Sequence, residues 1–169
     1  METGHGNTKR LIRSLGFLGR EAKAFGHALG SGNRSLGRLI IVGTPTYEPW
    51  HFTAHLADAA GRRDRRDLSP TLVRWQVPAG APAHLGVSVD VVAHASRDTT
   101  VLVIPDSDHP GLLERITDAR RRGARVMTIE RAESCLTMFT HELLTVGGGR
   151  SDQDYDACQH VVSSVAPGA

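Results

Sequence analysis

Apolar and polar positions along this chain follow two periods, which together predict an α/β domain. Short apolar runs bounded by turn residues are typical of buried strands, whereas apolar residues three or four positions apart are typical of helices. The predicted strands cover residues 39–42, 72–77, 101–104 and 125–129. The predicted helices between and after them cover residues 50–60, 84–96, 110–122 and 134–144. Because strands and helices alternate, we predict a Rossmann-like three-layer sandwich around a mostly parallel central sheet of about four strands.

The two ends of the chain differ in composition from this central region. Residues 9–29 place apolar residues toward one side and basic residues on the other, but each glycine within them weakens a helix by about 1 kcal/mol. We therefore predict a basic, partly helical N-terminal arm and linker over 1–37, an α/β domain over 38–146 and a flexible C-terminal tail over 147–169. The arm packs on the domain, joins a homo-oligomer or protein partner, or binds RNA, and these alternatives stay open. Deleting residues 1–36 should then leave a folded domain.

The composition argues against a membrane-spanning or secreted protein. With 169 residues the chain is long enough for one domain with a full core and two tails. Its formal net charge of +2 is too small to indicate nucleic-acid binding by itself, and no apolar run is long enough to cross a bilayer. The first residues lack the profile of a secretory signal, and Cys135 and Cys158 fit free thiols in a reducing compartment. These features predict a cytoplasmic protein without a membrane span.

The most informative segment is a buried strand that ends in acidic residues. The apolar run Val101–Ile104 leads directly into Pro105-Asp-Ser-Asp108, and a helical pattern follows. In parallel α/β sheets, ligands bind at the carboxyl ends of the strands. Two neighbouring carboxylates repel each other unless a cation, a proton or a basic partner lies between them. The loop therefore predicts a site for a divalent cation.

The order of motifs around this loop resembles the NYN domains, which are PIN-like ribonucleases related to LabA-type proteins. In that family a strand ends in a Ser-Gly-Asp-Ser-Asp-Phe type loop, and a helix and a Gly-Lys/Ala-Arg-Val strand entry follow. The matching segments here are Ile104–His109 for the loop and Arg122–Val126 for the strand entry. Similar segments also lie at Gly86–Asp90, Asp98–Leu102 and Leu136–Leu144, so that the resemblance covers roughly Arg38 to Val146.

This resemblance implies a metal-dependent endoribonuclease that hydrolyses RNA phosphodiesters. In such a protein, clustered carboxylates hold one or two Mg²⁺ or Mn²⁺ ions that activate a water molecule. Carried over to this chain, the metal ligands and catalytic residues are Asp90, Asp106 and Asp108. The residues expected to bind the RNA are Thr44, Arg120 and Arg121. The carboxylates of Asp90 and Asp106 should then lie within about 4–8 Å of each other.

The chain also departs from the family pattern at its first strand. That strand should end in a metal-ligating Asp, but here it runs Leu39-Ile-Ile-Val-Gly-Thr-Pro-Thr46, and the nearest carboxylate is Glu48. Two alternatives therefore stay open beside the nuclease. One is a catalytically silent NYN-like module that binds RNA or a protein. The other is a Rossmann-like sugar-phosphate or nucleotide-binding domain, since SIS-type domains also carry a strand, a loop and a helix before a Gly-Ala-x-Val strand. Those domains usually have Ser or Gly where this chain has Pro105-Asp-Ser-Asp108.

Three further features each have a structural and a functional interpretation. His51 and His55 are four positions apart on one predicted helix and could ligate zinc, although a chance pair among nine histidines explains them as well. Cys135 is expected to be a small buried residue, because nothing in the sequence places a base beside it. Asp108 also suits a helix N-cap, with Pro110 in the first turn.

Overall fold

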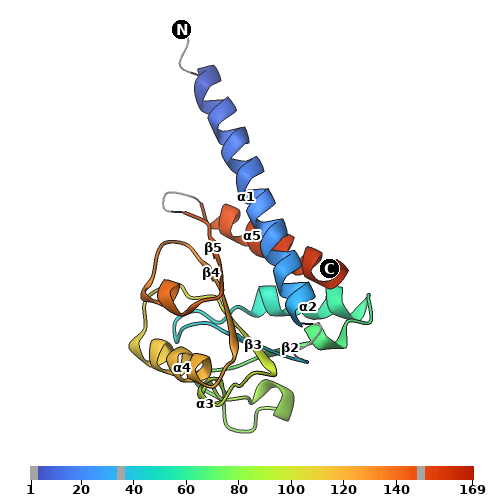
Figure 1. Cartoon of the computed structure of the whole chain (residues 1–169), viewed down its shortest axis with the longest axis vertical. Helices are drawn as coiled ribbons and strands as arrows, with labels where there is room; N and C mark the ends of the chain where they lie inside the picture. The colour runs from blue at the N-terminus through green and yellow to red at the C-terminus, as the bar shows by residue number, and fades with distance from the viewer. Residues whose placement is uncertain (1–3, 34–36, 148–150) are drawn as a thin grey trace.

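A parallel sheet forms the centre of the molecule (Figure 1). The computed structural model describes residues 4–33, 37–147 and 151–169. Within these ranges five strands pair in the order β2-β1-β3-β4-β5, and every pairing is parallel. The strands are β1 (Arg38–Val42), β2 (Pro70–Leu72), β3 (Thr99–Val103), β4 (Arg125–Glu130) and β5 (Glu142–Thr145). The predicted α/β three-layer sandwich with a parallel sheet is thus confirmed, with one strand more than expected.

The additional strand is β5, which lies within the segment predicted as a helix over 134–144. A 3₁₀ helix over Cys135–Phe139 comes first, and β5 then pairs along β4 with Met127 opposite Glu142. The short apolar pattern of this segment fits either element. Pairing decides for the strand, because the outer side of β4 offers backbone groups that a parallel neighbour satisfies.

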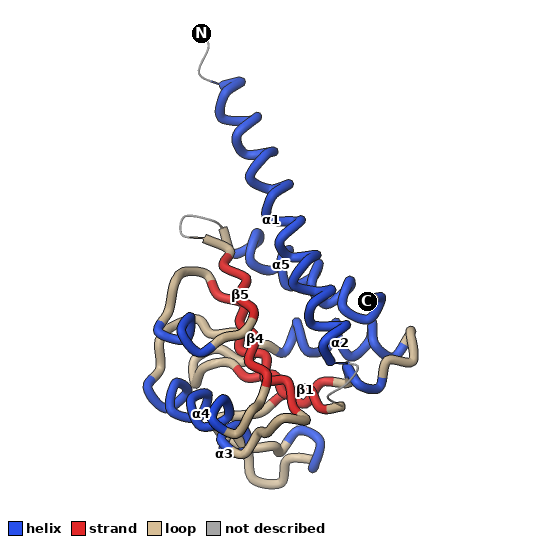
Figure 2. The backbone as a smooth tube through the Cα atoms, viewed as in Figure 1, coloured by secondary structure: helices blue, strands red, loops and turns tan. Residues whose placement is uncertain are grey.

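Helices cover both faces of the sheet (Figure 2). On one face lie α1 (Gly4–Asn33), α2 (Trp50–Gly61) and α5 (Asp152–Val165). On the other face lie α3 (Asp90–Ala93), α4 (Pro110–Arg121) and the 3₁₀ helix. Strand residues alternate between the two cores, as Ile41 and Leu102 face the first and Ile40 and Val101 the second. Both faces are therefore buried, which explains why β1 and β3 read as unbroken apolar runs.

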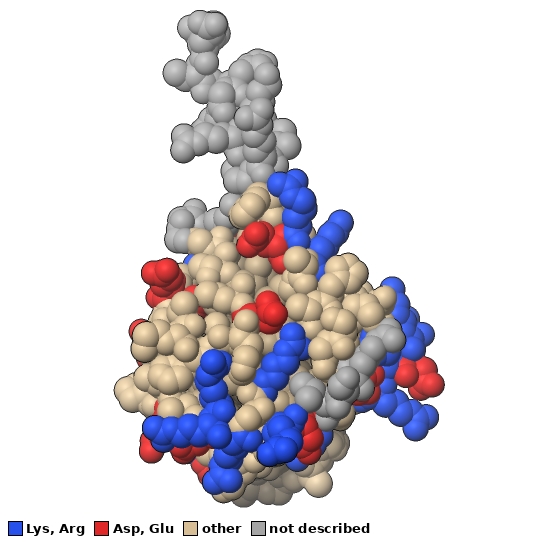
Figure 3. Space-filling view, in the orientation of Figure 1, with Lys and Arg blue, Asp and Glu red and all other residues tan. Residues whose placement is uncertain are grey.

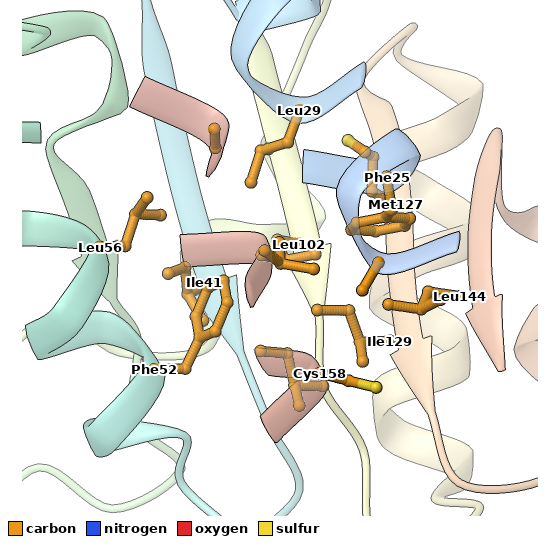
Figure 4. Close-up of a cluster of buried hydrophobic side chains, with 14 of the residues drawn as sticks. Phe25, Leu29, Ile41, Phe52, Leu56, Leu102, Met127, Ile129, Leu144 and Cys158 are labelled. Carbon is orange, nitrogen blue, oxygen red and sulfur yellow. The ribbon is translucent and has the colours of Figure 1, made fainter. Parts of the chain in front are cut away.

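The N-terminal helix is part of the core rather than a dispensable arm. Leu18, Ala22, Phe25 and Leu29 of α1 are buried against the sheet and α5, as Figure 4 shows for Phe25 and Leu29. A Cβ on Gly30 would lie 1.9 Å from the backbone oxygen of Ala166, so glycine permits close packing there. This packing argues against the prediction that deleting residues 1–36 leaves a folded domain, because the deletion would uncover this core. Residues 34–36 of the predicted linker lie outside the described ranges.

The predicted flexible tail is also wrong over most of its length. Ser151 and Asp154 form a capping box that begins α5, with each side chain accepting a hydrogen bond from the backbone N–H of the other residue. Tyr155, Cys158 and Val162 of α5 are buried in the same core as α1. The acid-rich start of this segment is therefore the first turn of a helix, where carboxylates complement the helix dipole.

No helix in the described ranges is long and apolar enough to cross a membrane.

Candidate functional site

The sheet has a topological switch point between β1 and β3. The helix that follows β1 packs on one face of the sheet, and the helix that follows β3 packs on the other. The loops that leave the carboxyl ends of these two strands therefore turn toward opposite faces. The last residues of the two strands, Val42 and Val103, are register partners. In open α/β sheets the crevice outside such a pair of carboxyl ends is where ligands bind. The loops 43–49 and 104–109 therefore define the candidate site.

A carboxylate joins the two loops. The Thr44 hydroxyl donates to Asp106 Oδ1, and the Thr46 hydroxyl donates to Asp106 Oδ2 over 2.9 Å. Ser107 Oγ adds a third hydrogen bond of 3.1 Å. We call Thr44, Thr46 and Asp106 the Thr–Asp clamp. Thr44, predicted to bind substrate, is completely buried and holds Asp106 instead.

The clamp favours the ionised form of Asp106. Partial burial raises the pKa of this carboxyl, but the hydrogen bonds from Thr44, Thr46 and Ser107 outweigh it and leave the pKa below its ordinary value. A depressed folded-state pKa stabilises the protein above the unfolded-state pKa of about 3.9, and this stabilisation is lost as pH falls through the folded-state value.

We expect Asp106→Asn to lower the free energy of unfolding by at most about 1 kcal/mol near pH 7, because the carboxylate is largely exposed. The difference from the wild type should shrink as pH falls below about 4, where the wild-type carboxyl is itself protonated. Urea unfolding of both proteins between neutral pH and about pH 3 measures this. A difference that stayed constant over that range would contradict the ionised clamp.

Beside the clamp lies a cavity of about 150 Å³ between the ends of β3 and β4. We call it the acidic cavity, and its lining residues are Pro105, Asp106, Ser107, Asp108, Glu130, Arg131, Ala132, Glu133 and Ser134. Glu130 is 1% exposed and accepts a hydrogen bond of 2.6 Å from Ser134 Oγ. Of the residues that line the cavity, Asp106 and Asp108 were predicted from the sequence, whereas Glu130 was not. The available signal was that Glu130 directly follows the predicted strand over 125–129, at the same edge of the sheet.

Asp108 contacts the 3₁₀ helix rather than capping α4. Its Oδ1 atom lies 3.2 Å from both the backbone N and Sγ of Cys135. The cap of α4 is His109, whose Nδ1 accepts from the backbone N–H of Leu112. Cys135 is an exposed residue, not a buried one as predicted. Partial desolvation of its thiol and the neighbouring Asp108 carboxylate raise the pKa of that thiol. The thiol is therefore a donor to Asp108 and a poor nucleophile at neutral pH.

Asp90 is engaged elsewhere. It starts α3 and accepts a hydrogen bond of 2.6 Å from Arg115 of α4, which together with Ser88 lowers its pKa. Asp90 is not among the residues that line the acidic cavity, whereas Asp106 and Asp108 both are. In the described part of the chain, no group of three or more His, Cys, Asp or Glu side chains is placed to hold a metal ion. The geometry thus gives no support to a joint metal site of the three aspartates.

The histidine pair that the sequence singled out does come together. His51 and His55 place their Nε2 atoms 3.1 Å apart on α2, and the ring of His160 from α5 stands at 89° to that of His55, with centroids 5.0 Å apart. His51 and His55 have the spacing of two nitrogen ligands of a zinc ion. The ring of His160, however, packs edge to face against that of His55.

Arg120 and Arg121, predicted to bind substrate, lie away from the candidate site. Helix α4 starts at the carboxyl edge of β3 and returns to the amino end of β4, so its last turn lies at the opposite edge of the sheet. Arg120 donates to the backbone oxygen of Phe139 over 2.9 Å, and Arg121 pairs with Asp118 at 3.6 Å.

A second and larger cavity, of about 460 Å³, lies near the ends of β1 and β2. Its lining residues are Pro45, Glu48, Arg74, Trp75, Gln76, Val77 and Pro78. Glu48, the carboxylate nearest the first strand, pairs with Arg74 at 3.2 Å and does not join the clamp. Trp75 Nε1 donates to the backbone oxygen of Gly43 over 3.0 Å, so this cavity adjoins the same loop from the other side.

Comparisons of the sequence alone find no relative. No protein-family model matches the chain, and no curated protein matches it.

Comparison of the fold does find similar solved structures. The NanR protein of Vibrio vulnificus complexed with ManNAc-6P matches with a TM-score of 0.60 at 11% identity, over 99% of this chain and 62% of that one. A protein of Salmonella typhimurium LT2 described as a candidate sugar-binding protein matches with a TM-score of 0.52 at 15% identity, over 96% and 47%. The C-terminal domain of glucosamine-fructose-6-phosphate aminotransferase from Francisella tularensis matches with a TM-score of 0.50 at 10% identity, over 99% and 45%. The chain spans less than two thirds of each of these structures.

These similarities correct the family resemblance drawn from the sequence. The structural neighbours are SIS-type proteins and not NYN or PIN-like nucleases, so the expectation of a ribonuclease is wrong. At such low identity the matches establish the fold alone. The fold agrees with the SIS-type alternative, whereas Mg²⁺ or Mn²⁺ as cofactor and RNA as partner stay untested predictions.

Proposed function

We propose that this chain is a sugar-binding domain that takes a sugar or sugar phosphate at the carboxyl edge of its sheet. The observation that carries the proposal is the acidic cavity, which adjoins the switch point in a fold shared with proteins described by their sugar ligands or substrates. Carboxylates and hydroxyls are the groups that hydrogen-bond sugar hydroxyls, and hydrogen bonds to a charged partner are the stronger ones.

The charge of the cavity selects the end of the ligand that enters it. Four carboxylates line it, from Asp106, Asp108, Glu130 and Glu133, against the single guanidinium of Arg131. Arg131 is itself engaged, since it pairs with Asp152 and lies over the ring of Tyr155. A phosphate would be repelled by this excess of negative charge, whereas hydroxyl groups or an ammonium group would be attracted. The ligand therefore inserts a hydroxyl or amino edge, and any phosphate points away from the cavity.

The size of the cavity agrees with partial insertion. Pockets that enclose a whole small ligand are usually about 300–1,000 Å³, and this cavity is about half the lower limit. Asp108 and Glu133 are lining carboxylates that lie at the surface outside the clamp. Of the two, Asp108 lies on the loop that leaves β3 at the switch point, so we take it as the residue that meets the ligand.

We expect an amino sugar to bind more tightly than the corresponding neutral sugar, and Asp108→Asn to weaken its binding about tenfold. The reason is the loss of a charge-assisted hydrogen bond, worth about 1.5–3 kcal/mol when fully desolvated and less in this exposed setting. Isothermal titration calorimetry with glucose, glucosamine and their 6-phosphates measures this.

The matched control is Asp118→Asn, which removes an equal charge from the exposed side of α4 without touching the cavity. Equal loss of affinity in both variants would assign the effect to net charge and would contradict the site. Absence of binding by all four compounds would contradict the proposed function itself.

A further inference from the structure

The edge strand β5 is held on β4 partly by a side chain. His141, directly before β5, makes two hydrogen bonds with one residue of β4. Its backbone N–H donates to the backbone oxygen of Val126 over 2.7 Å, and the backbone N–H of Val126 donates to its Nδ1 atom over 3.0 Å. In a regular parallel ladder a backbone carbonyl accepts the second of these bonds. Here an imidazole nitrogen accepts it, so this end of the pairing depends on the protonation state of a side chain.

Only the neutral ring can make this contact. A histidinium ion carries a proton on both ring nitrogens, so that Nδ1 would become a donor facing another donor. Val126 is completely buried, and leaving the N–H of a buried residue without a partner is unfavourable. His141 itself is exposed, so that a proton can reach its ring from the solvent. The contact therefore exists in one protonation state of the ring and not in the other.

The charges around His141 oppose a further positive charge. Arg120 of α4 places Nη1 3.2 Å from Nδ1 and 3.3 Å from Nε2, and Figure 3 shows basic side chains gathered over the end of α4. Partial burial and Arg120, together with Arg125 of β4, lower the pKa of His141, although the backbone of Val126 and the carboxylate of Glu142 on β5 act in the opposite direction. Because the folded-state pKa lies below the unfolded-state value of about 6.5, the neutral ring stabilises the protein above that pH. This stabilisation is lost as pH falls toward the folded-state value.

We propose that His141 is a pH-sensitive clasp, whose neutral ring holds the amino end of β5 on β4 and whose protonation loosens that end. The other end of the strand is held by groups that do not involve this ring. Val146, just after β5, donates its backbone N–H to the backbone oxygen of Glu130 over 2.9 Å, and Thr145 Oγ1 donates to Glu130 Oε1 over 3.4 Å. Protonation of His141 therefore opens β5 from its amino end, while the end beside the acidic cavity stays paired.

Hydrogen exchange of backbone amides, measured by NMR between about pH 7.5 and about pH 4.5, tests the clasp. We expect the protection of the Val126 amide, corrected for the intrinsic exchange rate, to fall at least about tenfold over this range. The Val146 amide at the other end of β5 should change less than about threefold. The loss at Val126 should follow the titration of the His141 ring itself, which the Cε1–H resonance reports in the same samples.

His141→Asn is the decisive variant. Its Oδ1 atom can accept the N–H of Val126 much as Nδ1 does, but an amide does not take up a proton in this range. The protection of the Val126 amide should then no longer depend on pH. The matched control is His84→Asn, which changes an exposed histidine on the 3₁₀ helix Ala83–Leu85 and should behave like the wild type.

Three results with the wild type alone would overturn the proposal. They are a constant protection of Val126, an equal loss at Val146, and a loss at Val126 that does not coincide with the titration of the His141 ring. A folded His141→Asn protein that kept the pH dependence of the wild type would also overturn it, as would its disappearance in His84→Asn.

Discussion

Phe25→Ala is expected to lower the free energy of unfolding by about 3–5 kcal/mol, a large fraction of the stability of a domain of this size. Phe25 is 4% exposed and packs from α1 into the core under the sheet, together with Leu29 and residues of α5. Truncation removes a large apolar side chain and leaves a cavity, because the sheet beneath cannot collapse to fill it. Urea unfolding followed by circular dichroism measures the loss.

Lys23→Ala provides the control on the same helix. Lys23 is exposed two positions earlier, and alanine is a slightly better helix former, so the change should be within about 0.5 kcal/mol. If Phe25→Ala were as mild as this control, α1 would be a loosely attached arm, as the sequence suggested, and not a structural helix.

Gly43→Ala is expected to destabilise the protein by about 1–3 kcal/mol and to abolish sugar binding. A Cβ at this position would lie 1.9 Å from the backbone oxygen of Tyr47 and 2.8 Å from Cδ of Pro49. That contact can be relieved only by moving the turn in which Thr44 and Tyr47 exchange two backbone hydrogen bonds. Because this turn carries Thr44 and Thr46, the hold on Asp106 is lost with it. Thermal melts and calorimetric titration with glucosamine measure the two effects.

Gly61→Ala is a control with the opposite sign. A Cβ on Gly61, the last residue of α2, meets nothing within 4 Å, so alanine should raise stability by up to about 1 kcal/mol. A Gly43→Ala protein that melts and binds like the wild type would show that the turn is not fixed by close packing.

The sequence predicted those parts of the fold in which local pattern and tertiary environment agree. β1 and β3 are continuous apolar runs because both faces of the sheet are covered, and α4 begins at Pro110 as its pattern indicated. The sequence indicated a partly helical arm at α1 but not that this helix belongs to the core, and it did not predict α5. There the glycines and acidic residues read as loop signals, yet Gly30 allows a close backbone approach and Asp154 completes a cap. Such roles depend on a partner distant in sequence, which no local pattern contains.

The candidate site was predicted in part for the same reason. Asp106 and Asp108 were found because they directly follow a buried strand, but Thr44 and Glu130 act through partners on other strands. The order of strand, acidic loop, helix and strand was attributed to NYN domains, although parallel α/β folds share that order generally. What distinguishes them is which loops meet at the switch point, and that depends on the strand order.

The last described residues lie beside the end of α1, and this has a consequence for how the protein forms (Figure 1). A single guanidinium, that of Arg65, donates to the backbone oxygens of Gly30, Pro167 and Ala169. Arg65 therefore joins the end of α1 to the residues that follow α5, and its contacts with Pro167 and Ala169 span more than a hundred residues. During synthesis, this face of the sheet stays incompletely covered until α5 has left the ribosome, because α5 completes the core that α1 and α2 share. Such long-range closure predicts slow folding, with a partly built intermediate whose exposed sheet face is open to chaperones.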